Sequence, residues 1–304
     1  DPPYDIYIEC KMRVIDRCGQ IFGTMTPLKG LTWVYDEIYV NEKSDPDIWH
    51  TFMTWQDNPF LASEEIQKLY DCMSKDELES RCYGKFVGHS GGVYNEFDEN
   101  LHVIEPFAVP YEWYDNISID PGLNNPLSAH WYAVDFDGNV YVIAEHYQAQ
   151  KDIIFHSQKI KEICDNLNWH RRNGYINALI DSAASQRTLA STKSVADLFY
   201  DNGILVNTNV NKDVFSGIQR VKSYFKNANG KARLFIFKNC TNMIREIKTY
   251  RWGDGDNPIK KDDHAVDELR YYIMSKPENK EAKPAKNLIQ RDKERLIRKI
   301  KYNH

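Results

Sequence analysis

Residues 115–134, DNISIDPGLNNPLSAHWYAV, contain the feature that decides the fold. The apolar run Ile117–Ile119 predicts a buried strand, and that strand ends in a carboxylate, Asp120. The Pro-Gly pair that follows turns the chain, and a second apolar run begins near Ala129. Because a buried carboxylate without a partner is unfavourable, Asp120 either begins the turn or faces a positive charge.

The composition permits a large core and argues against several classes of protein. The chain has 304 residues, 42% of them hydrophobic, and a net charge of -5, so it has room for two domains and no overall attraction to nucleic acid. Its six cysteines include no C-x-x-C pair, which argues against a zinc knuckle and suits a reducing compartment. No run approaches the roughly 18 apolar residues of a membrane span. The first residues lack the features of a signal peptide and an initiator methionine, so we expect the chain to begin inside a longer protein.

From residue 115 onward the pattern is three strands followed by alternating helices and strands. The expected strands are 116–121, 128–136, 139–147, the apolar part of INALIDSA (176–183) and GILVNTN (203–209). DFDGNV at 135–140 is a strong hairpin signal. The expected helices are 152–172, 192–202, 212–227, 240–252 and 262–275. This order predicts a mixed α/β sheet flanked by helices.

The first hundred residues follow another pattern. We expect a helix over 3–18, a short strand at Ile21–Met25 and two short helices within 62–81. Residues 84–114 are rich in glycine and proline, as is typical of a linker. At the other end, residues 276–304 carry roughly six excess positive charges.

Carboxylates stand at two strand ends and on one helix. Asp120 ends one strand, and Asp181 ends the strand in ALIDSA. In KKDDHAVDELRYY, Asp263 and His264 precede Asp267 by four and three residues, which places them on one helical face. Several carboxylates do not stay ionised together without a cation, and hard oxygen ligands favour Mg²⁺ or Mn²⁺. The pattern predicts two such ions, roughly 3.5–4 Å apart, one activating a water and the other stabilising the leaving oxygen in phosphodiester hydrolysis.

Each of these residues also has a purely structural interpretation. Asp120 before Pro-Gly is a common turn former, and Asp181 can cap the segment that follows it. Asp263 can be a helix N-cap or a partner of the helix dipole, and His264 alone is more often structural than a ligand. The conjunction of all these positions favours the metal site.

The order of these motifs resembles the nuclease domain of the large terminase subunit of tailed bacteriophages, a family with a ribonuclease-H-like fold. IDPG, LIDSA and DDHAVDELRY occur in the family's order. GHSGGVYNEFDENLHVIEPF resembles the passage between its ATPase and nuclease domains, and VFSGIQRVKSYF and CTNMIREIKTYRW resemble segments late in the nuclease domain. GTMTPLKGLTWVYDE is similar to the ATPase coupling motif, and the resemblance extends to about residue 275.

The resemblance implies that Asp120, Asp181 and Asp267 are the metal-binding catalytic triad, with Asp263 and His264 as nearby helpers. It also implies four parts of the chain: the end of a P-loop ATPase domain (1–85), a linker (86–114), a ribonuclease-H-like nuclease domain (115–275) and a basic tail (276–304). No G-x-x-x-x-G-K-[ST] motif occurs in the sequence, so ATP binding and hydrolysis are expected only of the intact protein.

The resemblance assigns weaker roles to four further residues. Thr24 and Thr26 would be the ATPase coupling residues, the alternative being a Thr-Pro turn after a strand. Ser185 and Arg187 would contact DNA phosphate, the alternative being a solvated loop. The basic tail would bind DNA or the portal, the alternative being a disordered, solvated end.

We therefore expect a metal-dependent DNA endonuclease that cuts concatemeric phage DNA during ATP-driven packaging into a procapsid. The resemblance implies double-stranded DNA, the portal protein and the small terminase subunit as partners. It implies a homo-oligomer only on the procapsid, and the host cytoplasm, transiently at the portal, as location. One alternative is a non-catalytic DNA-gripping and portal-docking part of the motor. Another is a different enzyme with a ribonuclease-H-like sheet, such as a resolvase, a transposase or a sugar-kinase or actin-type ATPase.

Overall fold

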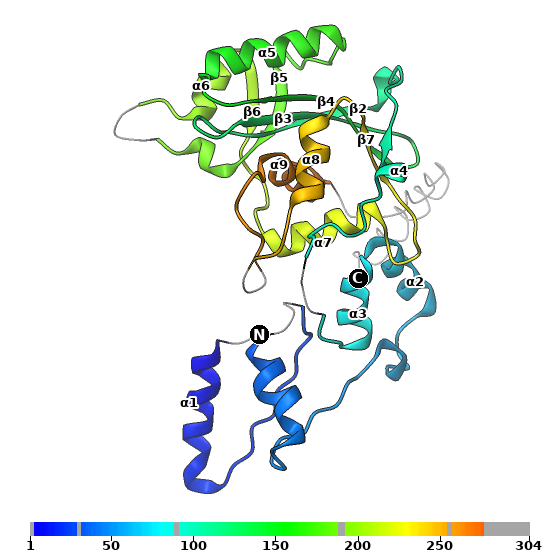
Figure 1. Cartoon of the computed structure of the whole chain (residues 1–304), viewed down its shortest axis with the longest axis vertical. Coiled ribbons are helices and arrows are strands. Elements are labelled where there is room, and N and C mark those ends of the chain that lie inside the picture. The colour runs from blue at the N-terminus through cyan, green and yellow to red at the C-terminus, as the bar shows by residue number, and fades with distance from the viewer. Residues whose placement is uncertain (1–2, 29–31, 88–90, 188–191, 254–256, 277–304) are drawn as a thin grey trace, which may run out of the picture.

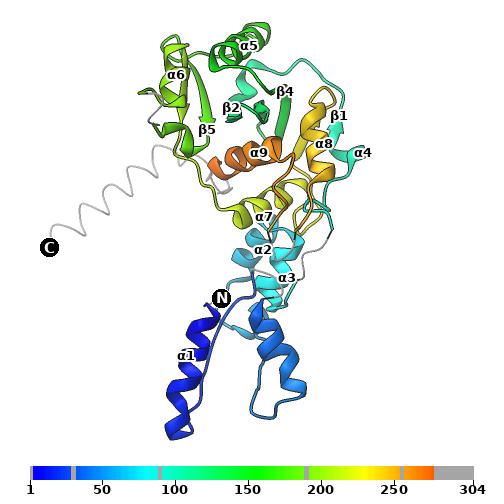
Figure 2. The same ribbon diagram turned by 60° about the vertical axis from the view of Figure 1, so that its left-hand side comes forward.

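A computed structural model of the chain describes residues 3–28, 32–87, 91–187, 192–253 and 257–276. The residues from about 91 onward form a sheet with helices on both faces, and the residues before 84 form a smaller, mainly helical part on one side of it (Figures 1 and 2). All but the first residue of the expected basic tail lies outside the described residues. None of the described helices has both the length and the apolar composition that crossing a bilayer requires.

The sheet is mixed, as the sequence predicts. In the described residues its strand order is β1-β7-β4-β3-β2-β5-β6. The strands are β1 (Val103–Ile104), β2 (Tyr114–Asp120), β3 (Leu127–Val134), β4 (Val140–Gln148), β5 (Ile176–Ile180), β6 (Ile204–Asn207) and β7 (Leu234–Phe237). The pairs β2–β3 and β3–β4 are antiparallel, and the other neighbouring pairs are parallel. The sequence analysis predicted β2 to β6 and missed β1 and β7.

Helices occur near every position where the sequence predicts one. They are α1 (Tyr4–Val14), α2 (Ser63–Cys72), α3 (Lys75–Tyr83), α5 (Ile153–Asn166), α6 (Val195–Asp201), α7 (Val214–Phe225), α8 (Thr241–Thr249) and α9 (His264–Ser275). The short helix α4 (Glu99–His102) was not predicted. Helix α5 ends earlier than the predicted residue 172, because Asn168 adopts a positive φ of 52°. The N–H groups of Asn168 and Trp169 then donate to the carbonyls of Asp165 and Cys164, a Schellman ending.

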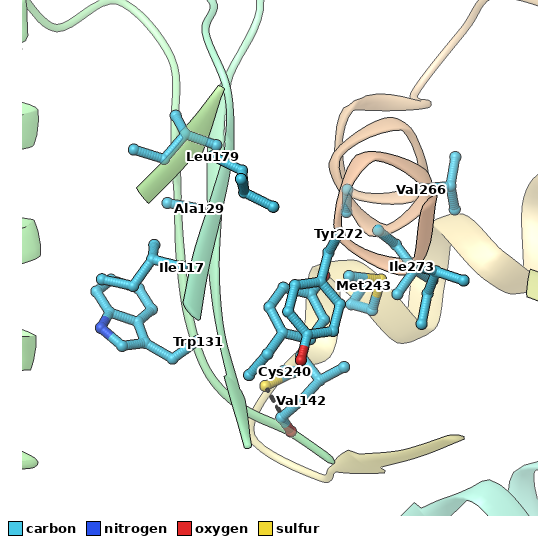
Figure 3. Close-up of a cluster of buried hydrophobic side chains, with 14 of the residues drawn as sticks. Ile117, Ala129, Trp131, Val142, Leu179, Cys240, Met243, Val266, Tyr272 and Ile273 are labelled. Carbon is cyan, nitrogen blue, oxygen red and sulfur yellow. Dashed lines mark hydrogen bonds between the residues drawn. The ribbon is translucent and has the colours of Figure 1, made fainter. Parts of the chain in front are cut away.

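The core lies between the sheet and the helices. Helices α5 and α6 cover one face of the sheet, and α7, α8 and α9 cover the other (Figure 1). Helix α9 packs on β2 and β3 and against α7 and α8. Figure 3 shows Tyr272 of α9 facing the strands, and Ile273 beside Met243 of α8. The Tyr272 ring stacks on Tyr132 of β3 with a centroid distance of 3.7 Å, which fixes α9 on the sheet.

The part before residue 84 has little core of its own. Neither α1 nor α2 has a buried residue. The strand predicted at Ile21–Met25 is wrong: the segment has no regular structure, and Phe22 is 85% exposed. An isolated extended run needs a partner strand for its backbone groups, and the described residues provide none there.

Helix α3 joins this part to the sheet-containing part. Ser74, which caps α3, donates from Oγ to Oε1 of Gln219 on α7 over 2.6 Å. The buried ammonium of Lys222, also on α7, lies 2.5 Å from a carboxylate oxygen of Asp76. These bonds dock α3 on α7.

Residues 91–114, which lie within the expected linker, take part in the sheet. Val93 and Tyr94 are buried, and Val93 donates its N–H to the carbonyl of Tyr250. Strand β1 pairs in parallel with β7. The domain boundaries at 85 and 115 stay a prediction.

Candidate active site

The first acidic residue, Asp120, is the last residue of β2. Its Oδ2 lies 2.9 Å from Nδ1 of His264, the first residue of α9. Burial raises the pKa of Asp120, and the bond to His264 opposes that effect. The same hydrogen bond raises the pKa of His264, which favours the charged ring. Asp120 therefore faces a positive partner.

The second acidic residue lies beside the first because β2 and β5 are parallel neighbours. Ile119 pairs with Ile180, so Asp120 and Asp181 both follow a paired residue at the same edge of the sheet. The Asp181 carboxylate accepts hydrogen bonds from Nζ of Lys212 at 2.8 Å, and from the Tyr271 hydroxyl at 2.9 Å.

Asp181 also caps the short 3-10 turn that follows it. Its Oδ1 accepts a hydrogen bond of 2.5 Å from the N–H of Ala183, so the alternative structural interpretation describes a real contact. Burial alone would raise the pKa of Asp181, but the donors Lys212, Ala183 and Tyr271 together lower it. The carboxylate is thus ionised and already compensated by an ammonium group.

Asp267 lies in the first turn of α9 and is less well compensated. Burial, reinforced by the charges of Asp263 and Asp120, raises its pKa to about 7 against the opposing effect of Arg270. Nη2 of Arg270 lies 2.9 Å from Oδ1 of Asp267, yet Oδ1 is buried without a hydrogen bond from the described residues. The Asp267 carboxylate thus has one cationic neighbour, Arg270, and two anionic ones, Asp120 and Asp263.

Asp263 precedes α9 and faces the same group of charges. Its carboxylate raises the pKa of both Asp120 and Asp267. Asp263 stands at the N-cap position of α9, as one of its structural interpretations has it, but its side chain makes no capping hydrogen bond. Asp120, Asp181, Asp263 and Asp267 form what we call the acidic cluster.

The acidic cluster has the chemistry of a site for a hard divalent cation. Its donors are carboxylate oxygens, the ligands that Mg²⁺ and Mn²⁺ prefer. A bound cation would relieve the repulsion by which Asp120, Asp181 and Asp263 raise the pKa of neighbouring carboxylates. No three His, Cys, Asp or Glu side chains in the described ranges form a ready-made metal site. The charges of His264, Lys212 and Arg270 stand beside the carboxylates instead.

A buried charged network holds α9 behind the acidic cluster. His130 of β3 lies 2.7 Å from a carboxylate oxygen of Glu268 and 3.0 Å from one of Glu145, and all three side chains are almost fully buried. Burial alone would lower the pKa of His130, but the two carboxylates raise it to about 9. Burial raises the pKa of Glu268 to about 7 despite His130. The Tyr132 hydroxyl also donates to Glu268, and the Ser118 hydroxyl donates to its carbonyl.

The four residues with weaker predicted roles lie apart from these contacts. Ser185 donates from Oγ to the carbonyl of Ser182, and Arg187 is 71% exposed and 3.7 Å from Asp197. Thr24 and Thr26 are exposed in the irregular segment after α1. Their predicted roles in DNA contact and ATPase coupling stay predictions.

The sequence analysis named His264, the partner of Asp120, and missed the other partners of the acidic cluster. Lys212 stands 31 residues from Asp181, and no spacing rule connects the two. Tyr271 could have been found, because it follows Asp267 by four residues, as Asp267 follows Asp263. Glu246, whose contacts with α9 are described below, carries no sequence signal either.

Comparison with known proteins agrees with the motifs. No family model matches the chain. A large terminase subunit from Enterobacteria phage LP7 is 23% identical over 282 residues, which are 90% of this chain and 55% of that protein. The chain thus spans about half the length of this curated relative.

Solved structures extend the similarity to the fold. The large terminase of a thermophilic bacteriophage matches with a TM-score of 0.68 at 19% identity, over 89% of this chain and 65% of that one. The nuclease domain of the P22 large terminase matches with a TM-score of 0.51 at 18% identity, over 61% of this chain and 92% of the domain. The ribonuclease-H-like fold class is confirmed. Sequence and fold together confirm the resemblance to the large terminase subunits of tailed bacteriophages that the order of motifs predicted.

Proposed function

We propose that this chain carries the metal-dependent DNA endonuclease of a phage packaging motor. The observation that supports it most is the placement of Asp120 and Asp181 at adjacent strand ends, with Asp267 of α9 beside them. The P22 nuclease-domain fold makes phosphodiester hydrolysis the chemistry to test first. The specific substrate is concatemeric double-stranded phage DNA, which the enzyme cuts.

In this proposal Asp120, Asp181 and Asp267 hold two Mg²⁺ or Mn²⁺ ions, with Asp263 as a further ligand. Bound ions of this kind supply an activated water and charge neutralisation at the phosphate. The rigid strand ends fix the two carboxylates of β2 and β5, and α9 fixes the third. Because ligand carboxylates must be ionised, Asp267 has to lose the proton that its raised pKa favours.

The cations beside the acidic cluster have separate tasks. The Lys212 side chain is 46% exposed, so its ammonium can leave Asp181 and contact a backbone phosphate of DNA. Arg270 is almost fully buried and stays paired with Asp267. His264 holds the Asp120 carboxylate in place through its ring nitrogen.

A plasmid-nicking assay with Mn²⁺ tests the proposal. Asp120→Ala and Asp181→Ala should each abolish nicking. Asp137→Ala is the matched control, since Asp137 is exposed in the hairpin between β3 and β4. Urea denaturation of each variant verifies folding. Nicking that persists in a folded Asp120→Ala variant would rule the proposal out.

The partners and setting follow from the resemblance and belong to the intact protein. We infer that ATP hydrolysis, the portal protein and the small terminase subunit act with this chain only there. Assembly into a homo-oligomer would occur on the procapsid, in the host cytoplasm and transiently at the portal. Purified intact protein with procapsids and ATP would package DNA in vitro, and failure to package would contradict this part.

A second candidate is a DNA-gripping part of the motor without cutting activity. Lys212 and Tyr271 occupy Asp181, and the described residues have no ready-made metal site, which favours this candidate. DNA binding in a gel-shift assay without nicking at any Mg²⁺ or Mn²⁺ concentration would support it. Metal-dependent nicking excludes it.

A further inference from the structure

Helix α9 is capped by a residue of another helix. Glu246 of α8 is fully buried, and its Oε2 accepts hydrogen bonds from the N–H groups of Ala265 at 2.6 Å and Val266 at 3.3 Å. Its Oε1 accepts a bond of 2.5 Å from the Tyr147 hydroxyl. The first N–H groups of a helix need acceptors and attract negative charge, so Glu246 satisfies both needs.

Asp263 stands where a helix N-cap residue would stand, but it has the wrong backbone conformation. An N-cap residue is normally extended, so that its side chain reaches the N–H two or three residues on. Asp263 has φ of −120° and ψ of 9°, and Asp262 before it has a positive φ of 49°. The Asp263 side chain makes no capping bond.

The N-terminus of α5 shows ordinary capping in the same chain. Asp152 is extended, with φ of −81° and ψ of 169°, and its Oδ1 accepts a bond of 2.8 Å from the N–H of Phe155. Asp213 caps α7 in the same way, through a bond of 2.7 Å from the N–H of Ser216. Of the three aspartates at the N-cap positions of α5, α7 and α9, only Asp263 makes no capping bond with its side chain. What differs at α9 is Glu246.

We propose that Glu246 is a positioning residue of the acidic cluster: it caps α9 and so leaves the Asp263 carboxylate free to bind the cation with Asp120 and Asp267. This inference rests on the proposed function. The Asp263 carboxylate could either accept hydrogen bonds from the first N–H groups of α9 or bind the cation. Because Glu246 already accepts those hydrogen bonds, the Asp263 carboxylate does not have to. It also fixes the first turn of α9, which carries His264 and leads to Asp267. Three hydrogen bonds and the helix N-terminus stabilise the buried charge of Glu246.

The first experiment compares Asp263→Ala with Asp152→Ala in the 304-residue chain. Asp152→Ala removes a true cap and should lower the urea midpoint by roughly 0.3 M, with the Mn²⁺ dissociation constant unchanged. Asp263→Ala removes no capping hydrogen bond and relieves the repulsion between Asp263 and the other carboxylates. The urea midpoint of this variant should therefore be equal to or higher than that of the wild type. Its Mn²⁺ dissociation constant, measured by calorimetry without DNA, should rise at least tenfold. Equal midpoint losses in both variants, or unchanged Mn²⁺ affinity in Asp263→Ala, would overturn the inference.

The second experiment tests Glu246 itself. Glu246→Gln keeps an acceptor for the Ala265 N–H, so the Mn²⁺ dissociation constant should stay within about threefold. Glu246→Ala removes the acceptor and should weaken Mn²⁺ binding about tenfold. Adding Asp263→Ala to Glu246→Ala should then cause little further weakening, because both changes remove the same ligand. Fully additive losses contradict the inference.

The design separates this inference from the proposed function. If Asp120→Ala leaves Mn²⁺ binding unchanged, the proposed metal site itself is wrong. If Asp120→Ala weakens Mn²⁺ binding while Asp263→Ala does not, the site stands and the role of Glu246 is refuted. The comparison of Asp263→Ala with Asp152→Ala remains decisive even if Glu246→Ala does not fold.

Discussion

Replacing His130 by glutamine should destabilise the protein strongly, and by an amount that depends on pH. His130→Gln removes the charge that two buried carboxylates, Glu145 and Glu268, share. Removing one partner of a buried ion pair typically costs about 3–5 kcal/mol. Because the glutamine amide can donate to only one of the two carboxylates, we expect a loss of about 4 kcal/mol near pH 7.5.

The sign of the pH dependence follows from the two pKa shifts. The folded pKa of His130, about 9, lies above the ordinary value of 6.5, so its stabilisation is complete below pH 6.5 and is lost as pH rises through 9. In the variant, Glu268 becomes protonated as pH falls through about 7 or higher, which removes the unpaired charge. At pH 5.5 Glu268 is protonated, whereas Glu145, whose pKa is lowered, still loses its charged partner, so the loss should fall to about 2 kcal/mol, typical of one charge-assisted hydrogen bond.

Urea denaturation at pH 5.5, 7.5 and 9.5 measures these differences. The difference between wild type and His130→Gln should pass through a maximum near the middle value. The double variant His130→Gln/Glu268→Gln is the control, because it removes both the positive charge and one of its negative partners. Its loss in free energy of unfolding should be smaller than the sum of the losses in the two single variants. A loss below about 1 kcal/mol at pH 7.5, or one independent of pH, would refute the charged network.

Three further predictions concern the site, the docking of α3 and the end of α5. Lys212→Met should tighten Mn²⁺ binding in calorimetry, because an ammonium no longer competes for Asp181, and should slow plasmid nicking; weaker Mn²⁺ binding would contradict this. Asp76→Ala leaves the buried Lys222 with a poorer partner and should lower the stability of the α3–α7 contact by about 2–3 kcal/mol. Hydrogen exchange in α3 would report the loss, and unchanged protection would argue against it. Asn168→Ala should lower the free energy of unfolding by about 1 kcal/mol because of its positive φ, whereas Asn168→Gly should be nearly neutral in the same urea assay.

The sheet was predictable where its strands are long enough to show a pattern. Strands β2 to β4 are apolar runs joined by turn signals, and they occur where the sequence places them. Strand β1 has two residues, too few for any periodicity. Strand β7 is an apolar run of four residues, as long as the predicted β6, and was overlooked. The segment Ile21–Met25 has a strand-like sequence and, among the described residues, no strand partner. Local pattern therefore failed where pairing with distant residues decides the structure.

The acidic cluster was predictable only in part. Asp120 and Asp181 each end an apolar run, and parallel pairing brings such ends together. Asp263 posed a choice between capping and facing the cluster, which its own sequence context does not decide. The deciding residue, Glu246, is on another helix and is recognisable only from its bonds to Ala265 and Val266. The functional roles of these residues stay predictions.

The docking of α3 on α7 has a mechanical consequence. Ser74 is hydrogen-bonded to Gln219 of α7, and Asp76 is paired with Lys222 of the same helix. Helix α7 packs directly against α9, which carries Asp267. A force on α3 is therefore transmitted to α9 through two helix contacts, that of α3 with α7 and that of α7 with α9. We expect a displacement of α3 to shift α9 and, with it, the Asp267 carboxylate.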